Sequence, residues 1–156
     1  MVLSNGEKVI RFRWIAFLTA AIFIPISFLR GEITIAILAF ILGAISGFSL
    51  DCLGVGVLKL WKYPRQEFLK KQYFGLVVPA WGAFGMSINL CWQWIQIPDP
   101  ITFFISTIVF IGLYELPNLK SSSWEYFAPT WLIVAGWFPL IFVFRMLFMM
   151  LSPIVL

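Results

Sequence analysis

The sequence contains no histidine, and this absence excludes several kinds of catalytic and metal site. A haem held by histidine, a metal centre built on imidazole and a Ser-His-Asp relay all require that residue. The two cysteines, Cys52 and Cys91, fall inside apolar runs at different depths, which argues against a disulfide and against a zinc site. The glycines lie mostly within apolar segments rather than in phosphate-binding loops. The sequence therefore predicts no metal site and identifies no cofactor.

Charged residues are also scarce: they make up 12% of the chain, whereas hydrophobic residues make up 62%. A soluble fold of 156 residues would have more apolar side chain than its core could bury, so the excess is expected to face lipid. The apolar runs are too long and too uniform for the alternating strands of a membrane β-barrel. The sequence therefore predicts an all-α fold, a polytopic membrane helical bundle that forms a single domain over residues 1–156.

Five apolar runs have the length of membrane spans, at roughly 20 residues each. Pro100 suits the first position of the fourth helix, and Pro117 ends that helix. The first run lacks a cleavage site and is expected to be retained. A four-span alternative would make the fourth helix a re-entrant segment, and a six-span alternative would need a longer carboxyl-terminal tail. The five helices are expected at about 14–29, 33–58, 73–95, 101–116 and 124–147.

Basic residues are distributed unevenly between these runs, and the asymmetry predicts the orientation of the protein. In the five-span topology, one side receives nine of them and the other side only Arg30 and Arg145. Because short loops rich in Lys and Arg stay inside, the amino terminus is expected to be cytoplasmic and the carboxyl terminus outside. The basic residues lie beside apolar segments, so membrane lipid headgroups are the expected partners and no nucleic acid is predicted. The nine residues are Lys8, Arg11, Arg13, Lys59, Lys62, Arg65, Lys70, Lys71 and Lys120.

Tryptophan and tyrosine cluster near the predicted helix ends, as in an aromatic belt, so most of them are interpreted as interface anchors. The segment from Lys62 to Lys71 mixes charged residues with a few apolar ones and is expected to lie as a short amphipathic stretch on the inner leaflet. The anchors are Trp14, Trp61, Tyr63, Tyr73, Trp92, Trp94 and Trp124.

Asp51 is the most informative polar residue, because a charge within a span is costly and usually faces the bundle interior. On a helix it shares a face with Gly43 and Gly47, and Gly54 follows three residues later. Small residues at this spacing let a neighbouring helix approach closely. Eight residues separate Asp51 from Lys59, which places the carboxyl group about 12 Å below the inner boundary. Asp51 is therefore either a pocket residue or a structural contact between helices.

Glu115 lies near the inner end of the fourth helix, on the same half of the membrane as Asp51. The two carboxyl groups are expected to converge in one polar pocket, in which Tyr114 and Tyr63 could donate hydrogen bonds. Such a pair in a low-dielectric pocket would supply a proton donor. The alternative is that Glu115 reaches Lys120 or water at the helix end.

The third helix carries a second inward-facing surface, on which Gly82, Gly85, Asn89 and Gln93 share one face. The glycines are expected to pack against another helix. Asn89 is expected to cross-link helices, with ligand contact by Asn89 or Gln93 as the alternative.

The segments Leu50–Gly54 and Leu60–Pro64 together resemble a pattern found in small, largely uncharacterised bacterial multi-pass membrane proteins. In that group an Asp-x-x-Gly in one span precedes Leu-Trp-x-Tyr-Pro, and a later span carries a Glu-Pro-like pair, for which residues 114–117 are the counterpart. More distantly, the chain is similar to the lycopene cyclase domain family, whose Asp, Trp-x-Tyr and paired glutamates line an isoprenoid pocket. The 79–82 segment lacks the acidic pair of those cyclases. The resemblance implies a location in a bacterial inner membrane.

Two functional hypotheses follow from these observations. The first is a non-catalytic membrane subunit or scaffold that packs against partner subunits, lipids or pigments. The second is an enzyme or carrier for an isoprenoid, carotenoid or lipid, with Asp51 and Glu115 as acid and base. Transport of a small solute is a third possibility.

Overall fold

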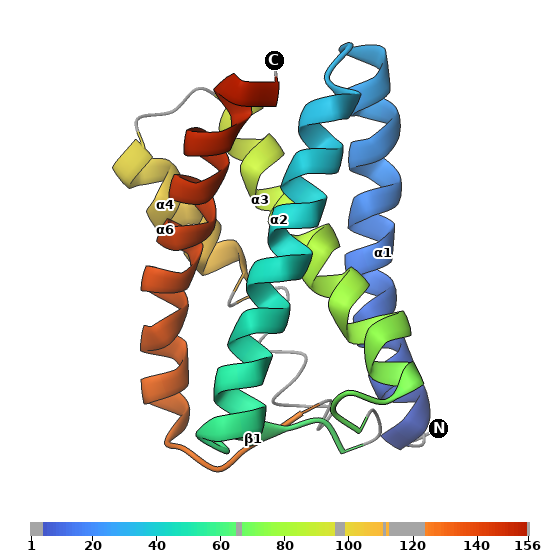
Figure 1. Ribbon diagram of the computed structural model, residues 1–156, viewed down its shortest axis with the longest axis vertical. Coiled ribbons are helices and arrows are strands. Elements are labelled where there is room, and N and C mark those ends of the chain that lie inside the picture. The colour runs from blue at the N-terminus through green and yellow to red at the C-terminus, as the bar shows by residue number, and fades with distance from the viewer. Residues whose placement is uncertain (1–4, 65–66, 96–98, 111, 113–123, 156) are drawn as a thin grey trace.

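The computed structural model describes residues 5–64, 67–95, 99–110, 112 and 124–155. Its helices form the bundle in Figure 1, and the all-α fold is confirmed. The helices are α1 (Asn5–Leu29), α2 (Ile33–Asp51), α3 (Val78–Ile95), α4 (Asp99–Phe110) and α6 (Thr130–Val155). A π-helical segment, η1 (Cys52–Val57), extends α2, and another, η2 (Tyr73–Val77), leads into α3. Two short antiparallel strands, β1 (Trp61–Lys62) and β2 (Glu125–Tyr126), complete the described structure.

Three helices in the described part of the chain are long and apolar enough to cross a membrane: Ile33–Val57, Tyr73–Ile95 and Thr130–Pro153. They correspond to the second, third and fifth predicted spans. The apolar helical stretch Phe17–Leu29 of α1 is shorter. Helix α4 has 12 residues and is therefore about 18 Å long, less than a hydrocarbon core of roughly 30 Å. The predicted continuation of the fourth helix over residues 113–116 lies outside the described residues.

The predicted start of the fifth helix at Trp124 is wrong, because α6 begins only at Thr130. The preceding residues pair with β1, and Trp61 lies opposite Tyr126 in the register. Pro129 then supplies the carbonyl that accepts the first helical hydrogen bond, from the Ile133 amide. At the other end α6 continues to Val155, past the predicted end at residue 147.

Helices α2 and α3 cross at their glycine faces, and this contact is the most extensive in the bundle. A Cβ atom built on Gly43 would lie 2.8 Å from the Gly85 Cα atom, so the two backbones touch. A Cβ atom built on Gly82 would likewise lie 2.7 Å from the ring of Phe40. Close packing of this kind supplies association energy between helices in lipid, where the hydrophobic effect is absent. The sequence-predicted glycine surfaces of the second and third helices therefore meet each other.

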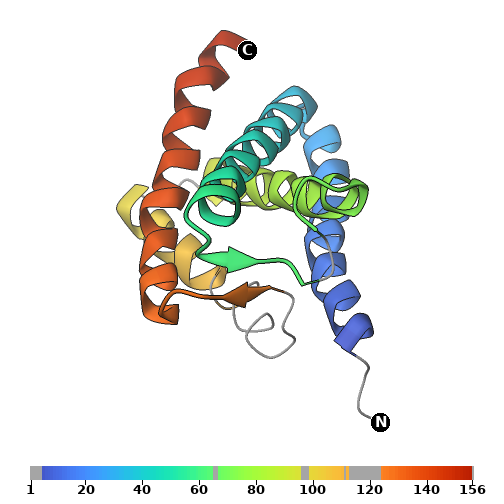
Figure 2. The same cartoon turned by 60° about the horizontal axis from the view of Figure 1, so that its bottom comes forward.

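The strands and the α1–α2 turn lie at opposite ends of the bundle (Figure 1). Figure 2 shows β1 and β2 side by side across the end where α2 finishes and α6 begins. Helix α4 lies in the half of the bundle away from this β ribbon (Figure 1).

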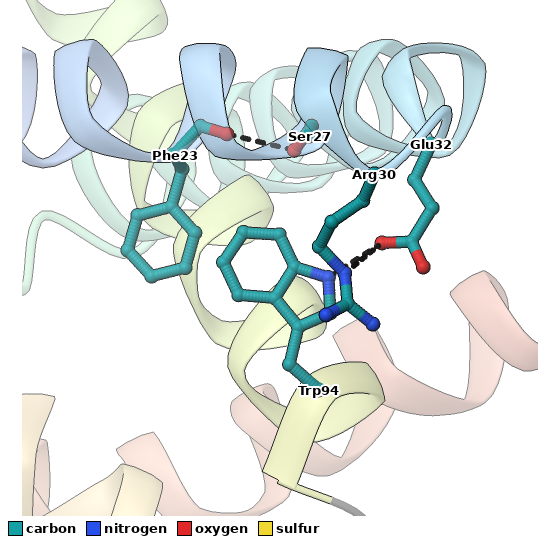
Figure 3. A network of polar contacts seen from close by, with 5 residues as sticks. All are labelled: Phe23, Ser27, Arg30, Glu32 and Trp94. Carbon is teal, nitrogen blue, oxygen red and sulfur yellow. Dashed lines mark hydrogen bonds and ion pairs between the residues drawn. The ribbon is translucent and has the colours of Figure 1, made fainter.

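At the α1–α2 turn, the Trp94 indole joins the end of α3 to the hairpin (Figure 3). Its Nε1 donates to Glu32 Oε2 at 2.5 Å, and the Arg30 Nε donates to the same oxygen at 3.1 Å. The Arg30 guanidinium lies 5.4 Å from the Trp94 ring centre, and Phe23 stacks on that ring at 5.1 Å. Gly31, with φ of +70°, makes the tight turn that brings Arg30 and Glu32 together.

Candidate functional site

Asp51 is fully buried and accepts four hydrogen bonds. Oδ1 receives the Trp61 indole N–H at 3.1 Å and the Tyr63 hydroxyl at 2.8 Å. Oδ2 receives the Tyr73 hydroxyl at 2.8 Å and the Trp81 indole N–H at 2.9 Å. We call these five residues the Asp51 cluster. It connects the end of α2 with β1, with η2 and with α3.

The glycines on α2 and η1 make room for the two indoles of the Asp51 cluster. A Cβ atom on Gly47 would collide with the Trp81 side chain, and one on Gly54 would collide with the ring of Trp61. The sequence-predicted glycine face therefore accommodates aromatic side chains beside Asp51 as well as a neighbouring backbone beside Gly43.

Both tyrosines of the cluster come from segments that depart from regular α-helix. Segment η1 begins directly after Asp51, and Tyr73 is the first residue of η2. Tyr63 follows β1 and, like Trp61 two residues earlier, faces Asp51, because alternate residues of an extended strand point the same way. Single π-helical turns occur frequently at functional sites, where they redirect a side chain.

The donors of the Asp51 cluster are neutral, and together they use the lone pairs of both carboxyl oxygens. Burial, followed by the charge of Asp51, raises the pKa of Tyr63 well above its ordinary value of 10, so this hydroxyl stays protonated and continues to donate. Hydrogen bonds to a carboxylate are short and strong. The geometry provides a fully satisfied acceptor, and neither oxygen is left to bind a substrate.

Aromatic rings pack around the Asp51 cluster and fix its tyrosines. The Tyr73 ring lies 5.9 Å from that of Tyr63 and 5.1 Å from that of Phe68, and Trp124 meets Tyr63 edge-on at 6.2 Å. The pairs with Phe68 and Trp124 are edge-to-face, and such pairs add to the energy of burial. Asp51 and Tyr73 are thereby fully buried, and Tyr63 is only 8% exposed.

The β ribbon closes the end of the bundle next to the Asp51 cluster. Lys62 Nζ lies 2.6 Å from Glu125 Oε2, and the Phe127 amide donates to the Leu60 carbonyl at 2.8 Å. The predicted amphipathic stretch from Lys62 to Lys71 is therefore wrong at its start, where Lys62 belongs to a strand and Tyr63 is buried.

An apolar cavity of about 180 Å³ lies beside the cluster, between the α2–β1 segment and the first half of α6. Its walls include the indoles of Trp61 and Trp81, whose N–H groups point to Asp51. The other lining residues are leucines, Ile133, Trp137, Gly54 and Gly136.

The interpretation of Tyr63 and Tyr73 as interface anchors is wrong, because both are buried and donate to Asp51. Trp61, which is partly buried, also donates to Asp51. Of these residues, Tyr63 was also expected as a donor in the Asp51 pocket, and the structure places it there. Trp81 is not among the sequence-predicted site residues. The signal that could have identified Trp61 and Tyr63 was the Trp-x-Tyr spacing itself.

The remaining candidates fall elsewhere. Asn89 was expected to cross-link helices, but in the described structure its Nδ2 donates within α3, to the backbone carbonyl of Gly85 one turn earlier, at 2.9 Å. Gln93 is exposed rather than inward-facing, although its neighbours Trp92 and Trp94 both pack against the core. Glu115 and Tyr114 lie outside the described residues, and so does the predicted convergence of Glu115 with Asp51.

No protein-family model, no curated protein and no solved structure matches this chain.

Proposed function

We propose that this chain is a non-catalytic integral membrane protein, a subunit or scaffold whose helices pack against partner subunits and lipids. The observation that carries the proposal is the state of Asp51. A catalytic acid or base must present a lone pair or a proton to its substrate. Asp51 is fully buried and its two oxygens accept four hydrogen bonds from the protein, which is the arrangement of a structural anchor.

Large apolar side chains on the outer surface support the proposal that the helices pack against partner subunits and lipids. Leu29, Phe28 and Trp131 are 83%, 72% and 72% exposed, and the outward face of α2 carries Ile37, Ile41 and Ile45. In a membrane these faces contact lipid or the helices of a partner.

The alternative is an enzyme or carrier for an isoprenoid, carotenoid or other apolar molecule. The observation that favours it is the apolar cavity beside Trp61 and Trp81. Only the indole rings of these two residues, which donate to Asp51, separate this space from the carboxyl group. In this alternative Asp51 would have to exchange one of its protein donors for a ligand, and Glu115 would be its partner.

For location, we propose the inner membrane of a bacterium, with the amino terminus and the β ribbon on the cytoplasmic side. The support is the nine-to-two distribution of basic residues in the five-span topology. Reporter fusions at each terminus test the orientation. A carboxyl-terminal reporter that is found on the cytoplasmic side would contradict it.

Purification of the tagged chain in mild detergent tests the function. We expect a second membrane protein to co-purify in a fixed ratio, measured by the mass of the intact complex. An isolated chain that carries an isoprenoid or pigment in a one-to-one ratio would instead support the alternative.

A further inference from the structure

We propose that the cavity between the α2–β1 segment and α6 holds an acyl chain of an anionic phospholipid, whose phosphate lies at Lys59. This binding site goes beyond the proposed function and does not depend on a protein partner. The lipid is drawn from the leaflet next to the β ribbon.

The chemistry of the walls selects a hydrocarbon occupant. The two indoles in the lining donate their N–H groups to Asp51, so they present only their ring carbons to the cavity. The remaining lining residues are aliphatic or aromatic, apart from glycine. An empty apolar space would forfeit dispersion contacts along both walls, and a hydrocarbon chain restores them.

The dimensions suit part of one acyl chain. The lining on α6 runs from Leu132 to Leu140, which is about 12 Å along the helix and close to the depth of one leaflet, half of roughly 30 Å. The volume of about 180 Å³ exceeds that of an engineered protein cavity of roughly 150 Å³ that binds benzene.

The cavity also opens sideways, toward the surrounding lipid. Leu53, Leu58 and Leu132 line it, yet these side chains remain 50%, 54% and 47% exposed. A chain can therefore enter from the bilayer without unfolding the bundle.

A cation next to the cavity lining in the sequence selects the headgroup. Lys59 is exposed and stands between Leu58 and Leu60, both of which line the cavity. Its φ of +51° is a strained conformation for a lysine, and such strain is often kept at binding sites. The next cation along the chain, Lys62, is paired with Glu125, so Lys59 is the residue of this turn that can meet a phosphate.

Photolabelling in lipid nanodiscs tests the site. The probe is phosphatidylglycerol with a diazirine on its acyl chain, and the labelled peptides are identified by mass spectrometry. We expect labels within residues 50–61 and 132–140. Labels confined to other segments of the wild-type chain would overturn the proposal.

Gly136→Leu is the matched test of occupancy, because Gly136 lines the cavity and an added Cβ there meets nothing within 4 Å. The larger side chain fills the space, and labelling of the two segments should fall at least fivefold. Gly75→Leu is the control, since Gly75 has the same open space but does not line the cavity. Equal labelling of both variants would overturn the site.

Lys59→Gly tests the headgroup, and glycine accepts the positive φ. The wild type should label more strongly with phosphatidylglycerol than with the phosphatidylcholine analogue, and Lys59→Gly should lose this preference. Leu69→Gly is the control, because Leu69 also has a positive φ, of 64°, but carries no charge. Equal labelling of the wild type by both lipids would overturn the anionic assignment. With a photoactivatable residue at position 136, a polyisoprenoid or a protein helix as the cross-linked product would overturn the phospholipid.

Discussion

The carboxyl group of Asp51 and the hydroxyl group of Tyr73 are joined by a 2.8 Å hydrogen bond across 22 positions of sequence. The bond links the last residue of α2 to the first residue of η2, and the intervening chain forms η1 and β1. Trp81, about one helix turn after the end of η2, donates to the same carboxyl oxygen. A single carboxyl group therefore fixes the angle between two helices that are candidate membrane spans.

Removing one hydroxyl from the Asp51 cluster should destabilise the protein measurably. Tyr73→Phe leaves the ring packing intact but removes a hydrogen bond to a carboxylate, which is worth about 1.5 to 3 kcal/mol. Unfolding by SDS titration of detergent-purified protein measures the loss. Tyr126→Phe, which alters a hydroxyl outside the cluster, is the control, and an equal loss for both variants would count against a special role for Asp51.

Gly47→Ala should destabilise the contact between α2 and α3. Its Cβ atom would collide with the Trp81 side chain, and forcing extra volume into a packed site costs about 1 to 3 kcal/mol. Gly75→Ala is the matched control, because its Cβ atom meets nothing within 4 Å. The midpoint of thermal unfolding should fall for the first variant and not for the second, and two equal midpoints would contradict the assigned helix face.

The ion pair between Lys62 and Glu125 should contribute little to stability. The two side chains are 49% and 46% exposed, and exposed pairs are worth less than about 1 kcal/mol. Lys62→Gln should therefore change the SDS unfolding midpoint less than Tyr73→Phe does. The reverse order would show that the β ribbon, rather than the Asp51 cluster, holds this end of the bundle.

Glu32 should make stability depend on pH at the opposite end of the bundle. Desolvation raises the pKa of Glu32, but hydrogen bonds from Arg30 and Trp94 and the charge of Arg30 together bring it below its ordinary value of 4.5. A carboxyl group with a lowered folded pKa stabilises the fold above its unfolded pKa, and this contribution disappears as the pH falls through the folded value.

The expected result for Glu32→Gln is a lower thermal midpoint than the wild type at pH 7, with a difference that shrinks as the pH is lowered below 4.5. Glu67→Gln, at an exposed position, is the control. A difference that persists unchanged in acid would mean that Glu32 acts through packing alone.

The helical fold and the glycine faces could be predicted from the sequence because they depend on local properties. Apolar runs of sufficient length predict spans, and Gly43, Gly47 and Gly85 recur at helical spacing. The partners of Asp51 could not be predicted in the same way. Trp61 lies in β1, where it pairs with Tyr126, 65 residues further along the chain. No local sequence pattern predicts that pairing, and so the contact of Trp61 with Asp51 could not be predicted either.

The two π-helical segments were likewise not predictable from apolar periodicity. Segment η2 positions Tyr73, and the short ribbon positions Tyr63, so both tyrosines resemble interface anchors when only their distance from a helix end is considered. Their role depends on tertiary structure.

The most direct test of the central claim, that Asp51 is a structural anchor, is the unfolding of Asp51→Asn in mild detergent. The amide nitrogen cannot accept a hydrogen bond, so two donors lose their acceptor, and we expect a loss of about 3 kcal/mol or more. Ser49→Ala, at an exposed position on the same helix whose hydroxyl donates to the Ile45 carbonyl one turn earlier, should leave stability unchanged. A structural role for Asp51 predicts a large fall in the unfolding midpoint for Asp51→Asn alone. A variant as stable as the wild type that had lost a bound apolar molecule or an activity would contradict it.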